Sequence, residues 1–368
     1  PCGITRAKKR STEVSRLKPP CDNAPLETDG AYGEGGGQLA RLAIALSAIT
    51  GRAIRLVNIR ARRARPGLAA QHLAALRAVA TLCGGELEGA ALGAGEVSFR
   101  PGPIRGGDYR FEVGTAGSVS LVLQAVLPVA LRADGPCRIT LVGGTDVKLA
   151  PPVDYLRMVI LPWLEDMSLR LRIAPVRHGY YPRGGGELTL DITPARRLRP
   201  LRAESRGAVL EIRGRAHVAH LPRHIAERMG NAARVLLADL APVQINVEVL
   251  GDESSVGTGG TLVLAAHTKH GRLGAAVVAE RGVSAEHLGE EAGRALRAEL
   301  QSGAGVDLHA ADQLLIYAAL AAGESRYTAR AVSLHAETAM WLIGQFLPVR
   351  FRVSQRAAVA SIDVLPAS

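Results

Sequence analysis

A single histidine near the C-terminal end occupies a position from which it could act as a nucleophile. His335 stands in a short loop, residues 333–337, between a strand expected over 325–332 and a helix expected over 338–346. The partial positive charge at a helix start lowers the basicity of an imidazole and favours its neutral, nucleophilic form. A histidine at such a position is also common as a cap or an exposed residue. The position alone therefore leaves both roles open, that of a nucleophile and that of a cap or exposed residue.

A glycine-rich loop with one carboxylate near the N-terminal end could surround phosphate oxygens. Residues 29–38 read DGAYGEGGGQ, so Glu34 stands among glycines and Arg41 follows one turn into an expected helix. Glycine backbone can approach a phosphate closely, and a helix N-terminus attracts anions. The loop lacks the Gly-Lys-Ser/Thr of a P-loop, and its glycine spacing differs from the dinucleotide-binding fingerprint. Taken as a bare glycine run, it is a weak signal.

Four arginines are concentrated in one turn between an expected strand and an expected helix. They are Arg60, Arg62, Arg63 and Arg65, and Gln71 follows on the helix. Guanidinium groups grip phosphates in a bidentate manner, so this turn could hold a polyphosphate. Runs of charge are often only solvated surface, and the turn taken alone favours that alternative. Together with the glycine-rich loop, it favours a phosphate site.

Two further segments could contribute to a site. Residues 177–186 read RHGYYPRGGG, and Asp312 with Gln313 begins an apolar helix shortly after His309. The side-chain amide of Gln313 and the ring of His309 could face a purine base. The alternatives are structural, since glycine-rich turns serve tight hairpins and an aspartate commonly caps a helix.

Three histidines and a glutamate in the middle of the chain superficially resemble a metal-ligand set. They are His217, His220, His224 and Glu227. An expected transition from strand to helix separates them, which argues against a metal site there.

The elements expected around these segments recur in one order. Each copy combines a loop, an apolar helix, a strand, a second loop and a second helix, and three copies of one βαβαββ-like unit are the simplest account. The expected elements are a helix within 33–51, a strand 53–59 and a helix 68–83; a helix 117–131, a strand 137–142 and a helix 153–164; and a helix 311–322, a strand 325–332 and a helix 338–346.

The third copy is interrupted by a stretch with strands and helices of its own. The strand expected over 187–192 belongs beside the end of the second unit, and the third unit's helices arrive only after residue 302. The sequence therefore predicts a basic, disordered tail over residues 1–24, a catalytic body of residues 25–205 and 303–368, and an inserted small domain over 206–302.

Composition narrows the class of protein. The net charge is +11 over 368 residues, mostly from arginine, which points to anionic partners such as nucleic acid or nucleotides. Aromatic residues make up only 4%, which argues against a stacking platform such as an RRM. No apolar run is long enough to span a membrane, and the first residues lack the apolar core of a signal peptide. The cysteines, which lack metal-ligand spacing, fit reduced thiols in a cytoplasmic protein: Cys2, Cys21, Cys83 and Cys137.

These motifs in combination closely resemble those of the RNA 3'-terminal phosphate cyclases. The resemblance rests on residues 33–38, 177–186, 312–313 and 333–335, and it runs from about residue 28 to residue 364. The pattern of Arg or His, Gly, two residues, Pro, one residue and three glycines looks like that family's signature, and residues 178–186 match it. The implied fold is α/β (α+β), with three βαβαββ repeats resembling the C-terminal domain of translation initiation factor 3 and an inserted thioredoxin-like α/β domain.

The resemblance also implies an activity and its residues. RNA 3'-phosphate ends would be converted to 2',3'-cyclic phosphates with ATP, through a covalent histidine–AMP intermediate on His335 and an RNA(3')pp(5')A intermediate. Glu34 would hold Mg²⁺ or Mn²⁺. By the same resemblance, the residues around the nucleotide, the phosphates or the RNA end are Arg41, Arg60, Arg63, Gln71, Gln124, Pro151, His309, Asp312 and Gln313. His309 stands where the family commonly has Tyr, so the contact with the base departs from the family pattern. The sequence leaves the oligomeric state open.

Two other classes remain as alternatives. An enolpyruvyl transferase would use related βαβαββ units, but it would leave residues 178–186 and His335 unexplained. A non-catalytic scaffold for RNA processing, like the cyclase-like proteins of ribosome assembly, would share the fold without the reactive groups. The joint presence of His335, Glu34 and Arg41 argues against that class.

Overall fold

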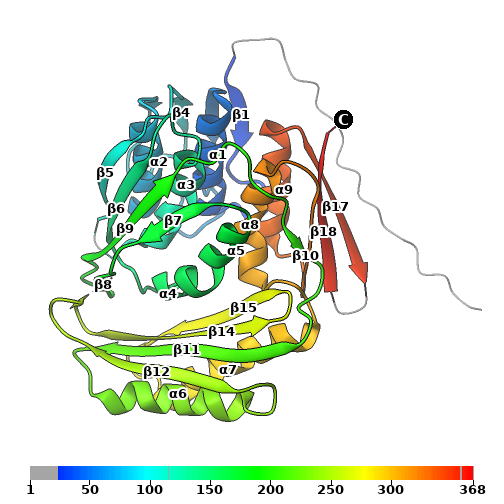
Figure 1. Ribbon diagram of the computed structural model, residues 1–368. Coiled ribbons are helices and arrows are strands. Elements are labelled where there is room, and N and C mark those ends of the chain that lie inside the picture. Colours follow the sequence, from blue (N-terminus) through cyan, green and yellow to red (C-terminus); the bar gives the residue numbers. More distant parts are fainter. Residues whose placement is uncertain (1–23, 115, 357–358, 368) are drawn as a thin grey trace, which may run out of the picture.

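The computed structural model describes residues 24–367, apart from residue 115 and residues 357–358. The basic tail expected over residues 1–24 lies outside the described residues except for its last residue. In Figure 1 the chain forms an upper body of helices and sheets, and a lower layer built from residues 209–302. The protein is a mixed α/β protein with several mixed sheets. Within the described chain, every helix is too short or too polar to cross a bilayer.

The first sheet comes from residues 26–100. In chain order its elements are β1 (Leu26–Asp29), α1 (Gly37–Thr50), β2 (Ile54–Val57), α2 (Ala70–Leu82), β3 (Glu86–Glu88) and β4 (Val97–Arg100). The strands lie in the order β1-β2-β4-β3. β1 runs parallel to β2, whereas β4 runs antiparallel to both of its neighbours.

The second sheet repeats this arrangement. Its elements are β5 (Gly107–Glu112), α3 (Val119–Ala130), β6 (Cys137–Gly143), α4 (Val153–Tyr155), the π-helix η1 (Leu156–Ile160), α5 (Leu161–Asp166), β7 (Arg170–Ile173) and β9 (Gly186–Thr193). The order is β5-β6-β9-β7, again with a parallel first pair and antiparallel later pairs. The strand expected over 187–192 is β9 and lies in this sheet. The helix expected over 153–164 is interrupted by one π-helical stretch.

The third sheet closes the body. Its elements are β10 (Arg202–Ala203), α8 (Leu308–Leu320), β16 (Ser325–Ala329), α9 (Leu334–Phe346), β17 (Val349–Arg356) and β18 (Val359–Pro366). The order β10-β16-β18-β17 has the same parallel and antiparallel pairs as the other two sheets. Three sheets thus share one strand order and one pattern of strand directions.

Residues 209–302 form a fourth sheet with its own core. Its elements are β11 (Val209–Ala219), α6 (Arg223–Leu237), β12 (Val243–Leu250), β14 (Gly259–Thr268), β15 (Gly271–Val278) and α7 (Ala285–Ser302). The strand order is β12-β11-β14-β15, and α6 and α7 cover the outer face (Figure 1). Both helices pack residues such as Met229 and Leu296 into a cluster separate from the main core. A short bridge, β8 (His178–Gly179) with β13 (Ser255–Val256), joins this layer to the body.

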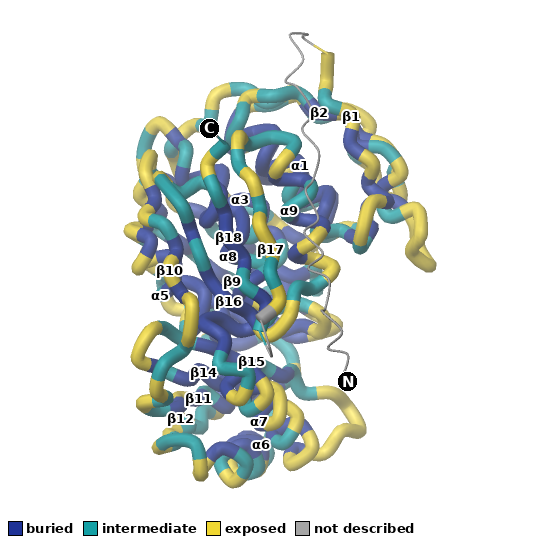
Figure 2. Tube along the Cα trace, turned by 90° about the vertical axis from the view of Figure 1, so that its right-hand side faces the viewer, coloured by how far each residue is buried: buried dark blue, intermediate teal, exposed yellow. Residues whose placement is uncertain are grey.

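The helices of the body pack together in its centre. α1 contacts α2, α3 and α9, and α8 contacts α9 and α3. In Figure 2 the buried parts of the tube follow these helices, among them α1 and α3. α1 is apolar on nearly all sides, as its sequence GQLARLAIALSAIT suggests, and this explains how it can stand at the centre.

Two helices begin earlier than the sequence analysis expects. α9 starts at Leu334 rather than residue 338, because Ser333 caps it by accepting a hydrogen bond from the amide of Ala336. α8 starts at Leu308 rather than residue 311, because Asp307 accepts bonds from the amides of residues 309 and 310. The expected loop over 333–337 is therefore wrong, and Asp312 lies inside a helix instead of capping it.

Candidate active site

His335 lies in the first turn of α9 and faces a carboxylate from the N-terminal glycine-rich loop. Its side chain is 49% exposed, and its Nδ1 atom lies 3.8 Å from Oε2 of Glu34. Arg63 forms an ion pair with the other carboxylate oxygen of Glu34 and donates a hydrogen bond of 3.1 Å to its backbone carbonyl. The structure thus brings together three of the expected site residues from distant parts of the chain.

The glycines around Glu34 are needed for the shape of the loop. Gly33 and Gly35 have φ angles of 56° and 58°, a region that residues with side chains rarely adopt. A Cβ atom at Gly36 would collide with the carboxylate of Glu34. The loop therefore folds tightly around its own carboxylate and directs it toward α9.

Arg41 is a buried cation beside this group. It is 6% exposed, its Nη2 donates to Oε1 of Gln124 at 3.4 Å, and its Nε has no hydrogen-bond partner. No carboxylate among the described residues forms an ion pair with it. Burial lowers the pKa of Arg41 to about 10, so the side chain stays charged at neutral pH. A buried, unpaired guanidinium is costly, and an anion such as a phosphate would compensate it.

His72, which is not among the expected site residues, lies beside Arg41 and is neutral. Burial, followed by the charges of Arg41 and Arg60, lowers the pKa of His72 to about 3. Its Nδ1 accepts a bond of 3.2 Å from the amide of Ala69, so the proton of the neutral ring is on Nε2. The available sequence signal was its position directly after Gln71.

The other side of His335 is formed by α8. Oδ1 of Asp312 accepts a hydrogen bond of 2.7 Å from the capping hydroxyl of Ser333, and burial raises the pKa of Asp312 to about 6. Gln313 reaches back to the carbonyl of His309 at 3.4 Å. These contacts place the start of α9 directly against the expected base-binding residues of α8.

The imidazole of His335 is neutral at physiological pH. Burial lowers the pKa of His335; Asp312 opposes the shift, and Arg41 and Arg63 add to it. A neutral imidazole has a free nitrogen lone pair, which is the form that can attack phosphorus.

Three expected site residues have other contacts in this structure. Arg60 donates to the carbonyl of Gly67 at 2.6 Å, and Gln71 accepts from the amide of Ser118 at 3.4 Å. Pro151 lies in the loop between β6 and α4, half-buried and without a hydrogen bond to the His335 group. The charges of Arg60 and Arg41 both act on His72, which follows Gln71 directly, so Arg60 and Gln71 lie near Arg41.

Residues 177–186, which match the family pattern, lie elsewhere, at the junction between the body and residues 209–302. Nδ1 of His178 lies 2.7 Å from Oδ2 of Asp146, and the hydroxyl of Tyr180 lies 2.8 Å from Nδ1 of His217. Nε2 of His217 lies 3.3 Å from Asp154. All these side chains are buried. The sequence draws attention to residues 177–186 and to His217 separately, but it gives no signal that they meet, because they are far apart along the chain.

The carboxylate of Asp146 in this junction cluster is held by hydrogen bonds from the protein itself. Ligand-type atoms of Asp146, His178 and His217 lie within 4.8 Å of one another, as in a metal site. Both carboxylate oxygens of Asp146, however, already accept hydrogen bonds, and Arg215 pairs with Asp154 at 2.6 Å. Hydrogen bonds therefore account for both oxygens of Asp146, whereas Nε2 of His217 has no hydrogen-bond partner among the described residues and lies 3.3 Å from Asp154. Of the other residues in the superficial metal-ligand set, His220 faces Asp252 and Glu227 pairs with Arg223.

Replacing Asp146 with asparagine is expected to destabilise the protein by about 3 kcal/mol at pH 7, because it weakens several hydrogen bonds to a fully buried carboxylate. Burial alone would raise the pKa of Asp146, but the neighbouring His178 and His217 outweigh it and hold the pKa below the ordinary 3.8. This stabilisation is therefore present above pH 3.8 and lost as the pH falls through the lower, folded-state value. Urea unfolding at pH 7 and at a series of values from about pH 4 downward measures both effects.

Asp191→Asn is the matched control for this experiment. Asp191 pairs with Arg138 on an exposed face, where solvent screens the pair, so its loss is expected to cost much less stability than the loss of Asp146. Equal stabilities of the two variants at pH 7 would contradict the proposed role of the junction cluster.

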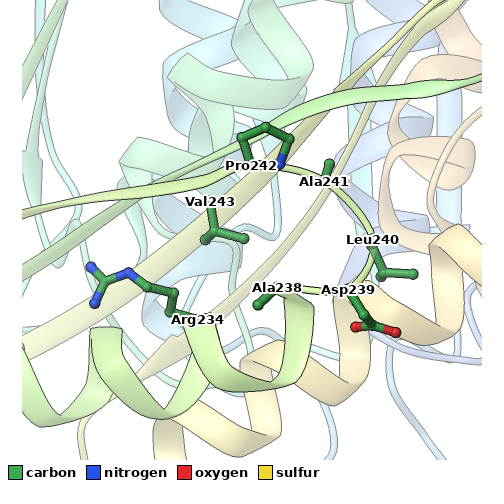
Figure 3. A pocket seen from close by; sticks show the side chains of 7 residues that line it. All are labelled: Arg234, Ala238, Asp239, Leu240, Ala241, Pro242 and Val243. Carbon is green, nitrogen blue, oxygen red and sulfur yellow. The ribbon is translucent and has the colours of Figure 1, made fainter.

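Two surface hollows lie apart from the His335 group. The first is lined by residues 234 and 238–243 at the end of α6, as Figure 3 shows. The second is lined mainly by residues 267–272, at the turn between β14 and β15, with Asp166, Leu210 and Glu211. Neither hollow contains an expected site residue.

Comparison with known proteins supports one family. Residues 32–353 match the family model described as RNA 3'-terminal phosphate cyclase. A relative of that name from Nitrosospira multiformis is 52% identical over 340 residues, covering 92% of this chain and 96% of the relative. Another of that name from Methanopyrus kandleri is 41% identical over 347 residues, covering 93% and 99%.

A solved structure titled EPSP synthase, from Acinetobacter baumannii, is 12% identical and covers 59% of this chain and 55% of that chain. Its TM-score of 0.25 is too low to bear on the fold or the activity. The family resemblance predicted from the sequence motifs is confirmed by the family match and by both relatives. This chain belongs to the RNA 3'-terminal phosphate cyclase family.

Proposed function

We propose that this enzyme converts RNA 3'-phosphate ends into 2',3'-cyclic phosphates with ATP, and that His335 carries AMP during the reaction. The observation that carries the proposal is the neutral, half-exposed imidazole of His335 at a helix start, beside Glu34 and Arg63. The names of the relatives, which cover nearly the whole chain, support the same reaction.

In the first step, a ring nitrogen of His335 bonds to the α-phosphorus of ATP, and the bond to pyrophosphate breaks. The neutral ring keeps its proton on the other nitrogen. Negative charge moves onto the departing pyrophosphate, and the fixed cations Arg41 and Arg63 are the groups that stabilise it. Because the cations are already in place, little reorganisation is needed.

In the second step, an oxygen of the RNA 3'-phosphate bonds to the phosphorus of AMP and His335 is released. In the third step, the neighbouring 2'-hydroxyl attacks the RNA phosphorus, and AMP leaves as the 2',3'-cyclic phosphate closes. The hydroxyl proton leaves with this attack. Both later steps again move charge between phosphates, which a rigid arginine-lined site favours.

Glu34 fits the role of a ligand for Mg²⁺ or Mn²⁺. Its carboxylate is 15% exposed, lies among glycines and faces His335, and carboxylate oxygen is the ligand type that these ions prefer. Mg²⁺ is commonly held by one or two carboxylates together with substrate phosphates. A bound ion would supply further charge neutralisation on the phosphates.

The proposed architecture is three repeats resembling the C-terminal domain of translation initiation factor 3, over residues 25–205 and 303–368, with a thioredoxin-like domain inserted over 206–302. The shared order of the three sheets supports the repeats. The insertion is supported by the separate core of that segment and by its place between β10 and α8.

Incubation with ATP labelled at the α-phosphate and Mg²⁺ is expected to leave an acid-labile, alkali-stable label on the protein. An RNA with a 3'-phosphate should then become resistant to phosphatase. Because the pKa of His335 lies below the ordinary 6.5, the labelling rate should hold from pH 8 to 6.5 and decline only in more acidic solution. An unlabelled protein that leaves the RNA end unchanged would refute the proposal and reopen the scaffold alternative.

A further inference from the structure

Two side chains on one face of α9, Thr338 and Trp341, contact the loop that carries Glu34. Residues three apart share a helix face, and this pair lies one turn after His335. Neither residue is among those that the family resemblance implies. Both connect the nucleophile's own helix to the loop of the carboxylate.

The first contact is a hydrogen bond from the loop backbone. The amide of Glu34 donates to Oγ1 of Thr338 at 3.0 Å, and the same hydroxyl donates to the carbonyl of Leu334 at 2.7 Å. The hydroxyl proton is therefore committed to the helix, and a lone pair is left for the loop. Thr338 is buried, so water cannot easily replace this acceptor.

The second contact is an aromatic stack on the other side of Gly33. The rings of Tyr32 and Trp341 have centroids 3.7 Å apart and an interplanar angle of 14°. Gly33 passes between the two contacts, and a Cβ atom there would collide with the hydroxyl of Thr338. The loop therefore lies directly on α9 and is held at residues 32 and 34.

We infer that Thr338 and Trp341 are positioning residues, which fix the carboxylate of Glu34 relative to His335. The inference rests on the proposed function and goes beyond it. Glu34 has its side chain within 3.8 Å of His335, but its backbone is held to α9 through Thr338. Loss of either contact should let the loop move away from α9. The affinity for a divalent ion at Glu34 should then fall by a larger factor than the rate of the reaction at His335.

Thr338→Val removes the hydroxyl at nearly constant volume and is the main test. The dissociation constant for Mn²⁺, measured by electron paramagnetic resonance without ATP or RNA, is expected to rise about tenfold, as for other residues that orient a metal ligand. The rate of histidine labelling at saturating Mn²⁺ should stay within about threefold of wild type. Trp341→Leu is expected to act in the same direction.

Three comparisons separate positioning from general damage. Thr338→Ser keeps the hydroxyl and should restore Mn²⁺ affinity. Thr50→Val removes an equivalent bond, from Thr50 Oγ1 to the carbonyl of Leu46 at 2.7 Å, outside the site and should leave the affinity unchanged. Glu34→Gln should abolish Mn²⁺ binding, which would identify the resonance signal as that of an ion bound at Glu34.

A Thr338→Val protein that binds Mn²⁺ as tightly as wild type would overturn the inference. So would a labelling rate at saturating Mn²⁺ that decreases by the same factor as the Mn²⁺ affinity. Failure of the proposed function looks different. In that case the wild-type protein would take no label from ATP, whatever the Mn²⁺ affinities of the variants.

Discussion

His335→Ala is expected to remove the protein-bound AMP label completely and to lower RNA cyclisation by about 10⁴-fold or more, because it removes the nucleophile proposed to form the covalent intermediate. The side chain is half-exposed, and the cap of α9 comes from Ser333, so the variant should keep its fold. Gel detection of the label and a thermal melt of the same preparation measure the two expectations.

His287→Ala is a matched control for that experiment. His287 also lies in the first turn of a helix capped by a serine, since its amide donates to Ser284, but the helix is α7, in the segment 206–302. This variant should be labelled as wild type is. A label that persists in His335→Ala would show that another residue carries AMP.

Arg41→Met is expected to lower the labelling rate by about 10²–10³-fold, the usual effect of removing a fixed charge that stabilises a transition state. The same change should leave the melting temperature unchanged or higher, because it removes a buried guanidinium that forms no ion pair in the described structure. Activity and stability should thus change independently or in opposite directions. Single-turnover labelling measures the labelling rate, and calorimetry measures the melting temperature.

The control for Arg41 is Arg132, another arginine whose pKa burial lowers. Arg132 donates to the carbonyl of Arg196 at 3.0 Å, away from His335. Arg132→Met should therefore spare activity. Full activity in Arg41→Met would remove this residue from the proposed mechanism.

Local chemistry explains which parts of the candidate site could be predicted from the sequence. A glycine-rich segment with one carboxylate predicts a tight loop, and the apolar run that follows His335 predicts a helix close to it. Both features are present, at Glu34 and His335. The exact starts of α8 and α9 were missed because the expected helices began at the apolar runs, while the caps Asp307 and Ser333 lie upstream of them.

Contacts between distant segments could not be predicted in the same way. The junction of Asp146, His178 and His217 depends on how residues 209–302 dock on the body, and no periodicity reports that. Thr338 could not be predicted for the same reason, because its contact with the loop of Glu34 joins residues that are far apart in the sequence. Residues 177–186 were noticeable in the sequence, yet their position at the junction and not at His335 follows from the structure alone.

The segment 206–302 leaves and rejoins the body at neighbouring points. The amide of Arg206 donates to the carbonyl of Gly303 at 3.3 Å, so the two crossing strands of chain stand side by side. A short turn could therefore join these points without moving the rest of the body. The hydrogen bond from Thr261 to the buried carboxylate of Asp146 then ties this segment to the body at a place away from both crossings, so its attachment does not depend on those two points alone.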